Sequence, residues 1–271
     1  MNQINEFVTT KEYKRFAEFC NACKVESYIG LCYGPAGVGK SMAAYHFAKW
    51  EIVERELKSK SQNFMDYKHP SVVIDDFDTV LYLPEVTNSP NAVRHQVINL
   101  ICDFEFLVSQ SIHRDKPDDW LELVRERVKL LIIDEADRLQ SKSLEQIRDF
   151  YDRHKIAVIF IGMPGIEKRL VRFPQLYSRI GFAHAYKPLC EEETAFIIKN
   201  HLHVFGISMN TDDFTDQEAI AAITRITQGN FRLINRLLKQ ATRIMKVNQL
   251  SSISKEVIDA ARECLVIGNI Y

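Results

Sequence analysis

The sequence predicts an α/β fold in which helices cover a parallel sheet, followed by a smaller all-α domain. Two observations predict it. The segments "SYIGLCYG", "KLLIIDE" and "IAVIFIGM" are apolar almost throughout and alternate with helical patterns, as strands do when both faces of a parallel sheet are buried. After Pro188 the pattern changes to consecutive helices. We therefore place a core domain at residues 1–187 and a helical domain at residues 188–271.

The elements of the core follow in chain order. A helix at residues 11–24, capped by Thr9 or Thr10, precedes the strand "SYIGLCYG". A glycine-rich segment then leads into one helix over residues 42–57. Residues 71–86 carry one long or two short strands, and residues 91–108 and 118–128 read as helices. The strand "KLLIIDE", a helix at residues 143–154 and the strand "IAVIFIGM" follow.

The second domain is expected to contain four helices. They cover residues 190–206, 216–229, 230–248 and 254–266, with Gly206 and Gly229 as stop signals.

Composition narrows the functional classes. Of the 271 residues, 46% are hydrophobic and 26% charged, which is typical of a globular protein. Because the net charge is −1, anion binding must come from local clusters or from repeated subunits. No apolar run approaches the roughly 18 residues of a membrane span, and the N-terminus lacks a secretion signal.

The six cysteines predict free thiols rather than a metal site. Cys20 and Cys23 form a single CxxC inside a helical pattern, without the second pair that a zinc site needs. We therefore expect reduced thiols in a cytoplasmic protein.

The segment from Gly34 to Ser41, "GPAGVGKS", matches the phosphate-binding pattern G-x-x-x-x-G-K-[ST] between a strand and a helix. Glycines allow backbone N–H groups to wrap phosphate oxygens, which side chains would obstruct. Lys40 would bring a charge to the outer phosphates, and the Ser41 hydroxyl would bind Mg²⁺. A glycine turn with a solvated lysine is the alternative.

The strand "KLLIIDE" ends in Asp134 and Glu135. At such a strand end in P-loop ATPases, the aspartate helps to hold Mg²⁺ and the glutamate polarises the attacking water. An acidic helix cap is the alternative interpretation. The letters D-E-A-D do not indicate a helicase, because that class needs two tandem cores and this chain holds one.

Three arginines are candidates for contact with the nucleotide. Arg179, in "YSRIG", could reach the γ-phosphate of a neighbouring subunit, and Arg172 is the second choice. Arg232, in "GNFRLINR", could contact the nucleotide from the helical domain. The alternative for each is an ordinary surface arginine.

The helix that contains Arg232 also carries a basic stripe. Residues 219–254 contain no acidic residue, and five cations recur at intervals of four and three: Arg232, Arg236, Lys239, Arg243 and Lys246. Such a stripe is typical either of contact with phosphate, DNA or an acidic partner, or of a solvated helix face.

Together these features resemble the AAA+ ATPases and, within them, the transposon ATPases of the TnsC/TniB/MuB group. The resemblance covers nearly the whole chain and rests on the P-loop and on "LLIIDEADRLQSKSLEQIRDF", "AVIFIGMPGIEKRL", "FPQLYSRIGF" and "GNFRLINRLL". It implies a P-loop AAA+ core followed by an all-α lid.

The resemblance also implies a Mg²⁺-dependent ATPase. ATP would be bound by Arg232 and the P-loop residues Gly34, Pro35, Ala36, Gly37, Val38, Gly39, Lys40, Ser41 and Met42. Mg²⁺ would be held by Ser41 and Asp134; Glu135 would activate water, and Arg179 would act in trans. The family often places a water-orienting polar residue where this chain has Met163, so either hydrolysis is slow or another residue assists.

The family's activity would be the regulation of DNA transposition. By this resemblance, an ATP-bound homo-oligomer, a ring or helical filament, would encircle double-stranded DNA and recruit a transposase, with a target-selection adaptor as a further partner. Asn88, Asn91 and Arg94 are candidate DNA contacts, against an ordinary loop and helix cap. A AAA+ loader or remodeller that acts on a protein without binding DNA is the alternative function, and a small-molecule kinase is disfavoured.

Overall fold

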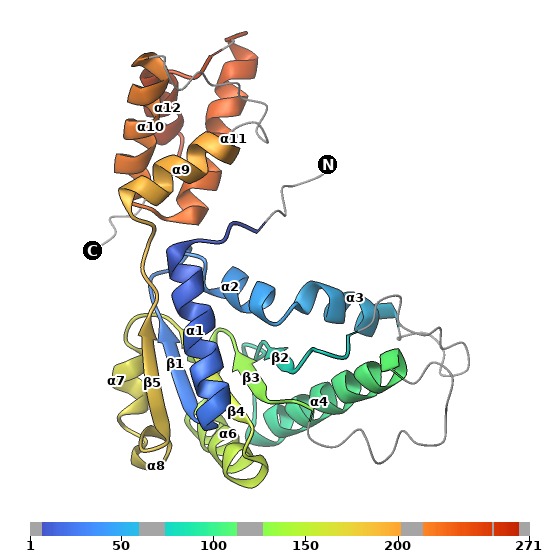
Figure 1. The fold of residues 1–271 in the computed structure, drawn as a ribbon. Helices are drawn as coiled ribbons and strands as arrows, with labels where there is room; N and C mark the ends of the chain where they lie inside the picture. Colours follow the sequence, from blue (N-terminus) through green and yellow to red (C-terminus); the bar gives the residue numbers. More distant parts are fainter. Residues whose placement is uncertain (1–6, 60–73, 113–126, 202–213, 251, 266–271) are drawn as a thin grey trace. The chain divides into compact units, whose positions relative to one another are not determined.

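The computed structural model describes residues 7–59, 74–112, 127–201, 214–250 and 252–265 (Figure 1). The chain forms two compact units. The sheet unit comprises Arg15–Gly34 and Lys40–Ala185, and the helical unit comprises Met1–Lys14, Pro35–Gly39 and Tyr186–Tyr271. The sequence placed the boundary after residue 187. It gave no sign that Pro35–Gly39, the apex of the glycine loop, groups with the C-terminal helices.

The sheet unit is built on five parallel strands in the order β2-β3-β4-β1-β5. The central strand, β4, pairs with a neighbour on each side, and its Val158 lies opposite Ile29 of β1 and Leu131 of β3. All residues of β3 and β4 are buried. The strands are β1 (Ile29–Tyr33), β2 (Thr79–Tyr82), β3 (Leu130–Ile133), β4 (Ala157–Gly162) and β5 (Ile180–Ala185). The predicted parallel α/β sheet is confirmed.

Strand β5 was not predicted. It forms one edge of the sheet and pairs with β1 alone, and four of its six residues are exposed. A strand of this kind lacks the continuous apolar run by which the buried strands were recognised.

Helices pack around the sheet (Figure 1). Helix α1 comes so close to β1 that a Cβ on Gly30 would lie 2.6 Å from Cys23 Sγ and 2.7 Å from Phe19 Cζ. Helices α4 and α6 contact each other. The helices are α1 (Lys11–Glu26), α2 (Lys40–Phe47), α3 (Trp50–Ser59), α4 (Pro90–Ile112), α6 (Ser141–His154), α7 (Ile166–Leu170) and α8 (Pro174–Tyr177), with a 3-10 helix at Ala136–Arg138.

Helix α1 begins where the sequence predicted. Thr10 Oγ1 accepts a hydrogen bond from the Tyr13 N–H at 3.0 Å, as a helix cap does. The first turn belongs to the helical unit, where the Lys11 N–H donates to Glu193 Oε1 at 2.8 Å.

The prediction of one helix over residues 42–57 was wrong. Lys49 has a left-handed backbone (φ 49°), so the helix stops after Phe47 and a second one, α3, starts at Trp50. Two other predictions fall on residues that are not described: residues 71–73 of the second strand region, and residues 118–126 of the helix expected at 118–128. The described remainder of the strand region holds one strand, β2.

The structure describes all six cysteines, and all six are free thiols. Cys20, Cys23 and Cys32 are buried. Burial raises the pKa of Cys23 to about 12, so this thiol stays protonated at neutral pH.

The helical unit contains the four predicted helices: α9 (Glu191–His201), α10 (Phe214–Thr227), α11 (Phe231–Val247) and α12 (Lys255–Glu263). They enclose a second apolar core with Ile223, Leu237 and Ile258 at its centre. The expected stop at Gly229 is present, with φ 74°; Gly206 lies outside the described residues. In the described part of the chain, no helix combines the length and apolar character needed to cross a membrane.

Two side-chain caps begin the last two helices and allow a matched stability test. Asn230 Oδ1 accepts from the Leu233 N–H at 3.2 Å, and Asn230 Nδ2 also donates to the Ala36 carbonyl at 2.8 Å. Ser254 Oγ accepts from the Val257 N–H at 3.4 Å.

Removal of either cap should lower the free energy of unfolding by about 1 kcal/mol. We expect Ser254→Ala to lose the cap alone, and Asn230→Ala to lose the cap and the bond to the glycine loop. Asn230→Ala should therefore show the larger loss in denaturant unfolding, while Asn230→Asp, which keeps the cap acceptor, should lie between wild type and Asn230→Ala. Equal losses for Asn230→Ala and Ser254→Ala would show that the Ala36 bond contributes nothing.

Candidate functional site

The glycine loop connects β1 to α2, as the phosphate-binding pattern requires. At its start the Gly34 N–H donates to the Gly162 carbonyl of β4 at 3.4 Å. Gly37 and Gly39 have φ values of 81° and 112°, a backbone region that residues with a Cβ rarely adopt. The two glycines therefore shape the loop with backbone alone, which leaves N–H groups available to an anion.

Within the helical unit, the start of α11 packs directly on the apex of this loop. The Arg232 N–H donates to the Gly37 carbonyl at 3.2 Å. A Cβ on Gly37 would lie 2.6 Å from Asn230 Oδ1 and 2.8 Å from Arg232 Cβ. The structure thus brings Arg232, the residue predicted from the second domain, to the phosphate loop, and its side chain is exposed there.

Lys40 and Ser41 begin α2, so both lie at the N-terminal end of a helix, where anions are stabilised. Lys40 is 8% exposed, and its Nζ donates to the Gly34 carbonyl at 2.5 Å. Its ammonium is therefore held inside the curve of the loop. Ser41 and Met42 are exposed.

The two predicted carboxylates follow β3 and differ in their surroundings. Asp134 is 9% exposed, and its Oδ1 accepts from the Glu135 N–H at 2.9 Å. Glu135 is exposed, has a left-handed backbone (φ 49°, ψ 43°) and pairs with Arg138. Strain of this kind in a residue other than glycine is typical of functional positions.

The sheet order determines the distance between the start of the loop, at the end of β1, and the carboxylates, at the end of β3. Strand β4 lies between β1 and β3, so the ends of β1 and β3 are two strand spacings, about 10 Å, apart. Gly34 and Asp134, which follow β1 and β3, therefore lie at the same edge of the sheet with one strand between them.

These residues fit ATP with Mg²⁺. Positive-φ glycines, a lysine and a helix N-terminus suit a triphosphate. In the described ranges, no group of three or more His, Cys, Asp or Glu side chains could bind a metal by itself. A Mg²⁺ ion shared with phosphate oxygens needs only one or two protein oxygens, which Ser41 and Asp134 would supply. When bound, the ion would neutralise phosphate charge.

Met163 directly follows β4 and is exposed, as the sequence analysis placed it. The structure adds a polar group there that sequence reasoning missed. Asp137 Oδ2 accepts from the Met163 N–H at 2.7 Å and would lie 2.7 Å from a Cβ on Gly162. A carboxylate from the turn after β3 thus occupies the end of β4. The only signal in the sequence was the second aspartate of D-E-A-D.

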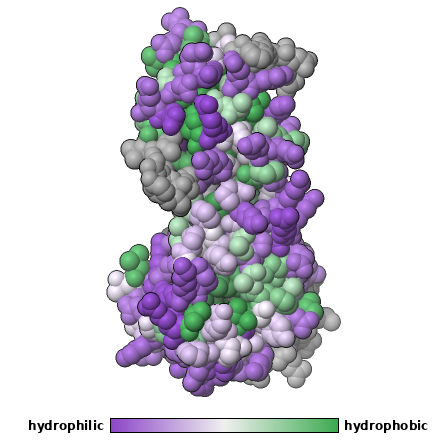
Figure 2. Space-filling view, turned by 90° about the vertical axis from the view of Figure 1, so that its left-hand side faces the viewer, coloured by the Kyte–Doolittle hydropathy of each residue, from purple (hydrophilic) through white to green (hydrophobic). Residues whose placement is uncertain are grey.

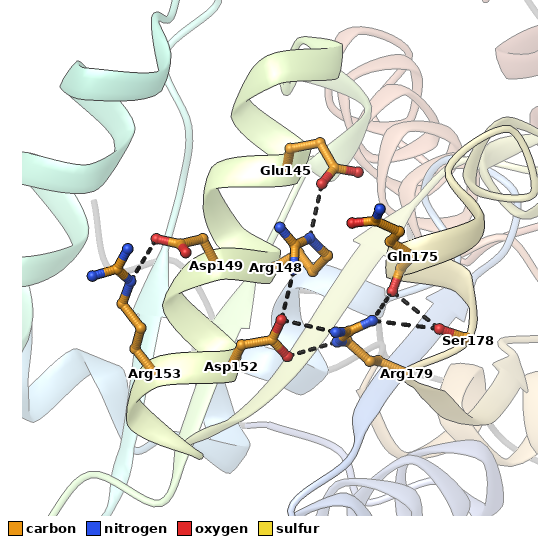
Figure 3. A network of polar contacts seen from close by, with 8 residues as sticks. All are labelled: Glu145, Arg148, Asp149, Asp152, Arg153, Gln175, Ser178 and Arg179. Carbon is orange, nitrogen blue, oxygen red and sulfur yellow. Dashed lines mark hydrogen bonds and ion pairs between the residues drawn. The ribbon is translucent and has the colours of Figure 1, made fainter.

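Arg179 lies at the start of β5 in a network of charges on α6 (Figure 3). Its Nε and Nη2 donate to the two carboxylate oxygens of Asp152 at 2.6 and 2.9 Å, and Nη1 donates to the Gln175 carbonyl. Arg148 also contacts Asp152, at 2.6 Å, and Glu145 at 2.8 Å. The hydrogen bonds from Arg179 lower the pKa of Asp152.

Because of this network, Arg179 must break its bonds to Asp152 before it can contact the phosphate of a neighbouring protomer. Its guanidinium is used inside its own protomer, so an arginine finger at this position must first leave Asp152. Asp152 would then still be paired with Arg148, so its charge would not be left uncompensated. Arg172, the second choice, is exposed.

The three predicted DNA contacts divide into two groups. Asn88 is 4% exposed; its amide donates to the carbonyls of Glu85 and Arg138, and its Oδ1 accepts from Ser143 Oγ at 2.8 Å. These bonds join the segment between β2 and α4 to the turn after β3, and they occupy the polar atoms of Asn88. The side chain is therefore not free to contact DNA, which corrects the prediction for Asn88. Asn91 and Arg94 are exposed in the first turns of α4.

Comparison with known proteins places this chain in a family. The AAA domain family matches residues 24–170. A Staphylococcus aureus protein described as a potential ATP-binding protein is 40% identical over 276 residues, 99% of both chains. Two solved structures share the fold: the RuvB Holliday junction branch migration motor of Thermotoga maritima (17% identity, TM-score 0.58, 98% of this chain and 72% of that chain) and ORC2 of Aeropyrum pernix (17%, 0.59, 98% and 71%). The chain belongs to the AAA domain family and has the P-loop AAA+ α/β fold.

Proposed function

We propose that this protein is an ATP-dependent regulator of DNA transposition. It binds ATP and Mg²⁺, assembles as a ring or helical filament on double-stranded DNA, and recruits or activates a transposase, with a target-selection adaptor as a further partner. The observation that carries the proposal is the pairing of a phosphate loop with the Asn230–Arg232 segment at its apex. Family membership and the name of the Staphylococcus aureus relative support the ATP-binding part, and the motif resemblance supports the transposition part.

Hydrolysis of the proposed kind needs four side chains. Lys40 would neutralise charge on the outer phosphates, and Asp134 would help to hold Mg²⁺. Glu135 would orient the water that attacks the γ-phosphorus and accept its proton as the bond to ADP breaks. Arg179 of a neighbouring copy would stabilise the charge on the transferred phosphoryl group.

Two of these four side chains, Glu135 and Arg179, form ion pairs inside the protomer. Glu135 pairs with Arg138, and Arg179 pairs with Asp152. Each pair must open before the group can act, so the isolated protomer should hydrolyse ATP slowly. Assembly would supply the contacts that open the pairs. Asp137, whose carboxylate lies at the end of β4, is the candidate for orienting water in place of a polar residue at Met163.

Lys40→Ala should weaken ATP binding roughly 10- to 100-fold, the equivalent of about 1.5–3 kcal/mol for a charge-assisted hydrogen bond. Isothermal titration with ATP and Mg²⁺ measures this change. Lys142→Ala, which removes an exposed lysine from α6, is the control and should bind like wild type. Unchanged affinity in Lys40→Ala would refute the phosphate assignment.

Arg179→Ala should leave ATP affinity intact and lower the turnover of the assembled protein by about 10³-fold or more, as the removal of an arginine finger does. Arg153→Ala, which breaks an ion pair with Asp149 on the same helix, is the matched control. A mixture of Lys40→Ala and Arg179→Ala should regain part of the turnover, because the first variant still supplies Arg179 to the second. Failure of every mixture to recover activity, with both variants assembling normally, would place the arginine in cis or elsewhere.

Assembly on DNA should depend on nucleotide. We expect negative-stain electron microscopy to show rings or filaments when the protein is mixed with non-specific duplex DNA and a slowly hydrolysed ATP analogue, and none without nucleotide. Protein that never associates with duplex DNA, even at low salt, would contradict the proposal and favour a AAA+ loader or remodeller that acts on a protein partner.

A further inference from the structure

Helix α11 has a buried apolar face and an exposed basic face. Its buried residues, Ile234, Leu237, Leu238, Ala241 and Met245, face the core of the helical unit. Its five basic residues, Arg232, Arg236, Lys239, Arg243 and Lys246, are all exposed. Arg232 belongs to the contact with Gly37. The other four, Arg236, Lys239, Arg243 and Lys246, are called the cationic face below.

The cationic face is a regular row of charges. Intervals of three and four residues place side chains on the same side of a helix, and the rise from Arg236 to Lys246, ten positions later, is about 15 Å. Its length and direction are fixed, because Asn230 caps the helix and the opposite face is packed in the core.

These charges have no carboxylate partner within the described ranges, where no ion pair joins any of the four to an acidic residue. Residues 219–254 contain no Asp or Glu. Helix α6 differs, because its Arg148 and Arg153 pair with acids at helical spacing. Like charges at this spacing repel one another, so the cationic face keeps an unfavourable interaction that an anionic partner would relieve.

The composition of the face indicates the kind of anion. Asn235 and Thr242, which lie among the four cations, are polar. Val247, next to Lys246 in the sequence, is exposed as well. With a single aliphatic side chain beside its cations, the face lacks the cluster of aromatic and aliphatic anchors that carries protein–protein interfaces. It also lacks the aromatic platforms on which single-stranded bases stack. Duplex phosphates require neither, because their recognition depends on spaced positive charge.

Figure 2 shows one side of the molecule, on which hydrophilic residues cover much of the surface. The net charge of the chain is only −1. A cationic row without acids nearby is therefore a local feature and does not follow from an overall basic composition.

We propose that the cationic face of α11 binds the phosphate backbone of duplex DNA without regard to base sequence. The inference rests on the proposed DNA-binding function and names a surface for it. Because Arg232, in the same helix, donates its N–H to the Gly37 carbonyl, the proposed DNA surface lies on the helix whose first turn contacts the apex of the phosphate loop. A few contacts per protomer suffice, since repetition along an assembly multiplies them.

The test measures affinity for a fluorescent duplex of random sequence by anisotropy, over a series of salt concentrations, with a slowly hydrolysed ATP analogue present. The logarithm of the affinity decreases linearly with the logarithm of the salt concentration. The magnitude of this slope becomes smaller by about 0.9 for each phosphate contact removed. Arg236→Gln/Lys239→Gln/Arg243→Gln/Lys246→Gln should therefore reduce the slope by about 3–4. Arg236→Gln and Arg243→Gln alone should each reduce it by about 1, which keeps the test decisive if the fourfold variant does not fold.

Two controls separate this surface from general charge and from the proposed function. Lys142→Gln/Lys168→Gln/Lys187→Gln/Lys255→Gln removes the same charge from exposed positions elsewhere and should keep the wild-type slope. Arg236→Lys/Arg243→Lys keeps the charge and should keep the slope as well. If wild type does not bind duplex DNA at low salt, the proposed function fails. If wild type binds and the cationic-face variants keep its slope, or if single-stranded competitor displaces duplex preferentially, this inference is overturned.

Discussion

The hydrogen bonds between the glycine loop and the start of α11 are the interaction on which the proposed link between ATP binding and DNA binding depends. The two ends of the loop belong to the sheet unit, while its apex, Pro35–Gly39, belongs to the helical unit. Asn230 donates to the Ala36 carbonyl, the Arg232 N–H donates to the Gly37 carbonyl, and a side chain on Gly37 would collide with both residues. Any change in the loop that accompanies phosphate binding would therefore be transmitted to the first turn of α11. The same helix carries Arg236, Lys239, Arg243 and Lys246 on its exposed face, so one rigid element joins the loop to the proposed DNA surface.

In the sheet unit, two of the charged side chains proposed to act in hydrolysis are paired with other side chains of the same protomer. The order β3-β4-β1 places one strand between Gly34 and Asp134, and Asp137 brings a carboxylate to the end of β4. Glu135 and Arg179, the groups that would act on water and on a neighbour's phosphate, are each paired inside the protomer. Ion pairs that are partly exposed, as these are, stabilise a protein by about 0–1 kcal/mol. The contacts of the proposed assembly would need to supply only that much free energy to open them, and a low turnover by single protomers is what this geometry predicts.

Sequence reasoning recovered the features that leave a local signature. The buried strands were visible as apolar runs, the four C-terminal helices as periodic patterns, and the phosphate loop as a spaced motif between a strand and a helix. Strand β5 was missed because an exposed edge strand has no apolar run, and the break at Lys49 was missed because a left-handed lysine has no composition signal. The pairs Arg179–Asp152 and Met163–Asp137 join residues 27 and 26 positions apart, and the bonds of Asn88 to Arg138 and Ser143 span 50 and 55 positions. Such contacts depend on the tertiary fold, which no local pattern encodes.

The most direct test of the central contact is hydrogen exchange of the backbone amides, compared with and without ATP and Mg²⁺. Residues 36–41 of the loop and residues 230–238 of α11 should gain protection together in the wild-type protein. In Asn230→Ala the loop should still gain protection while the gain in α11 shrinks. Protection confined to the loop in the wild-type protein, with α11 unchanged, would contradict the account, because it would show that phosphate binding does not reach the helix that carries the proposed DNA surface.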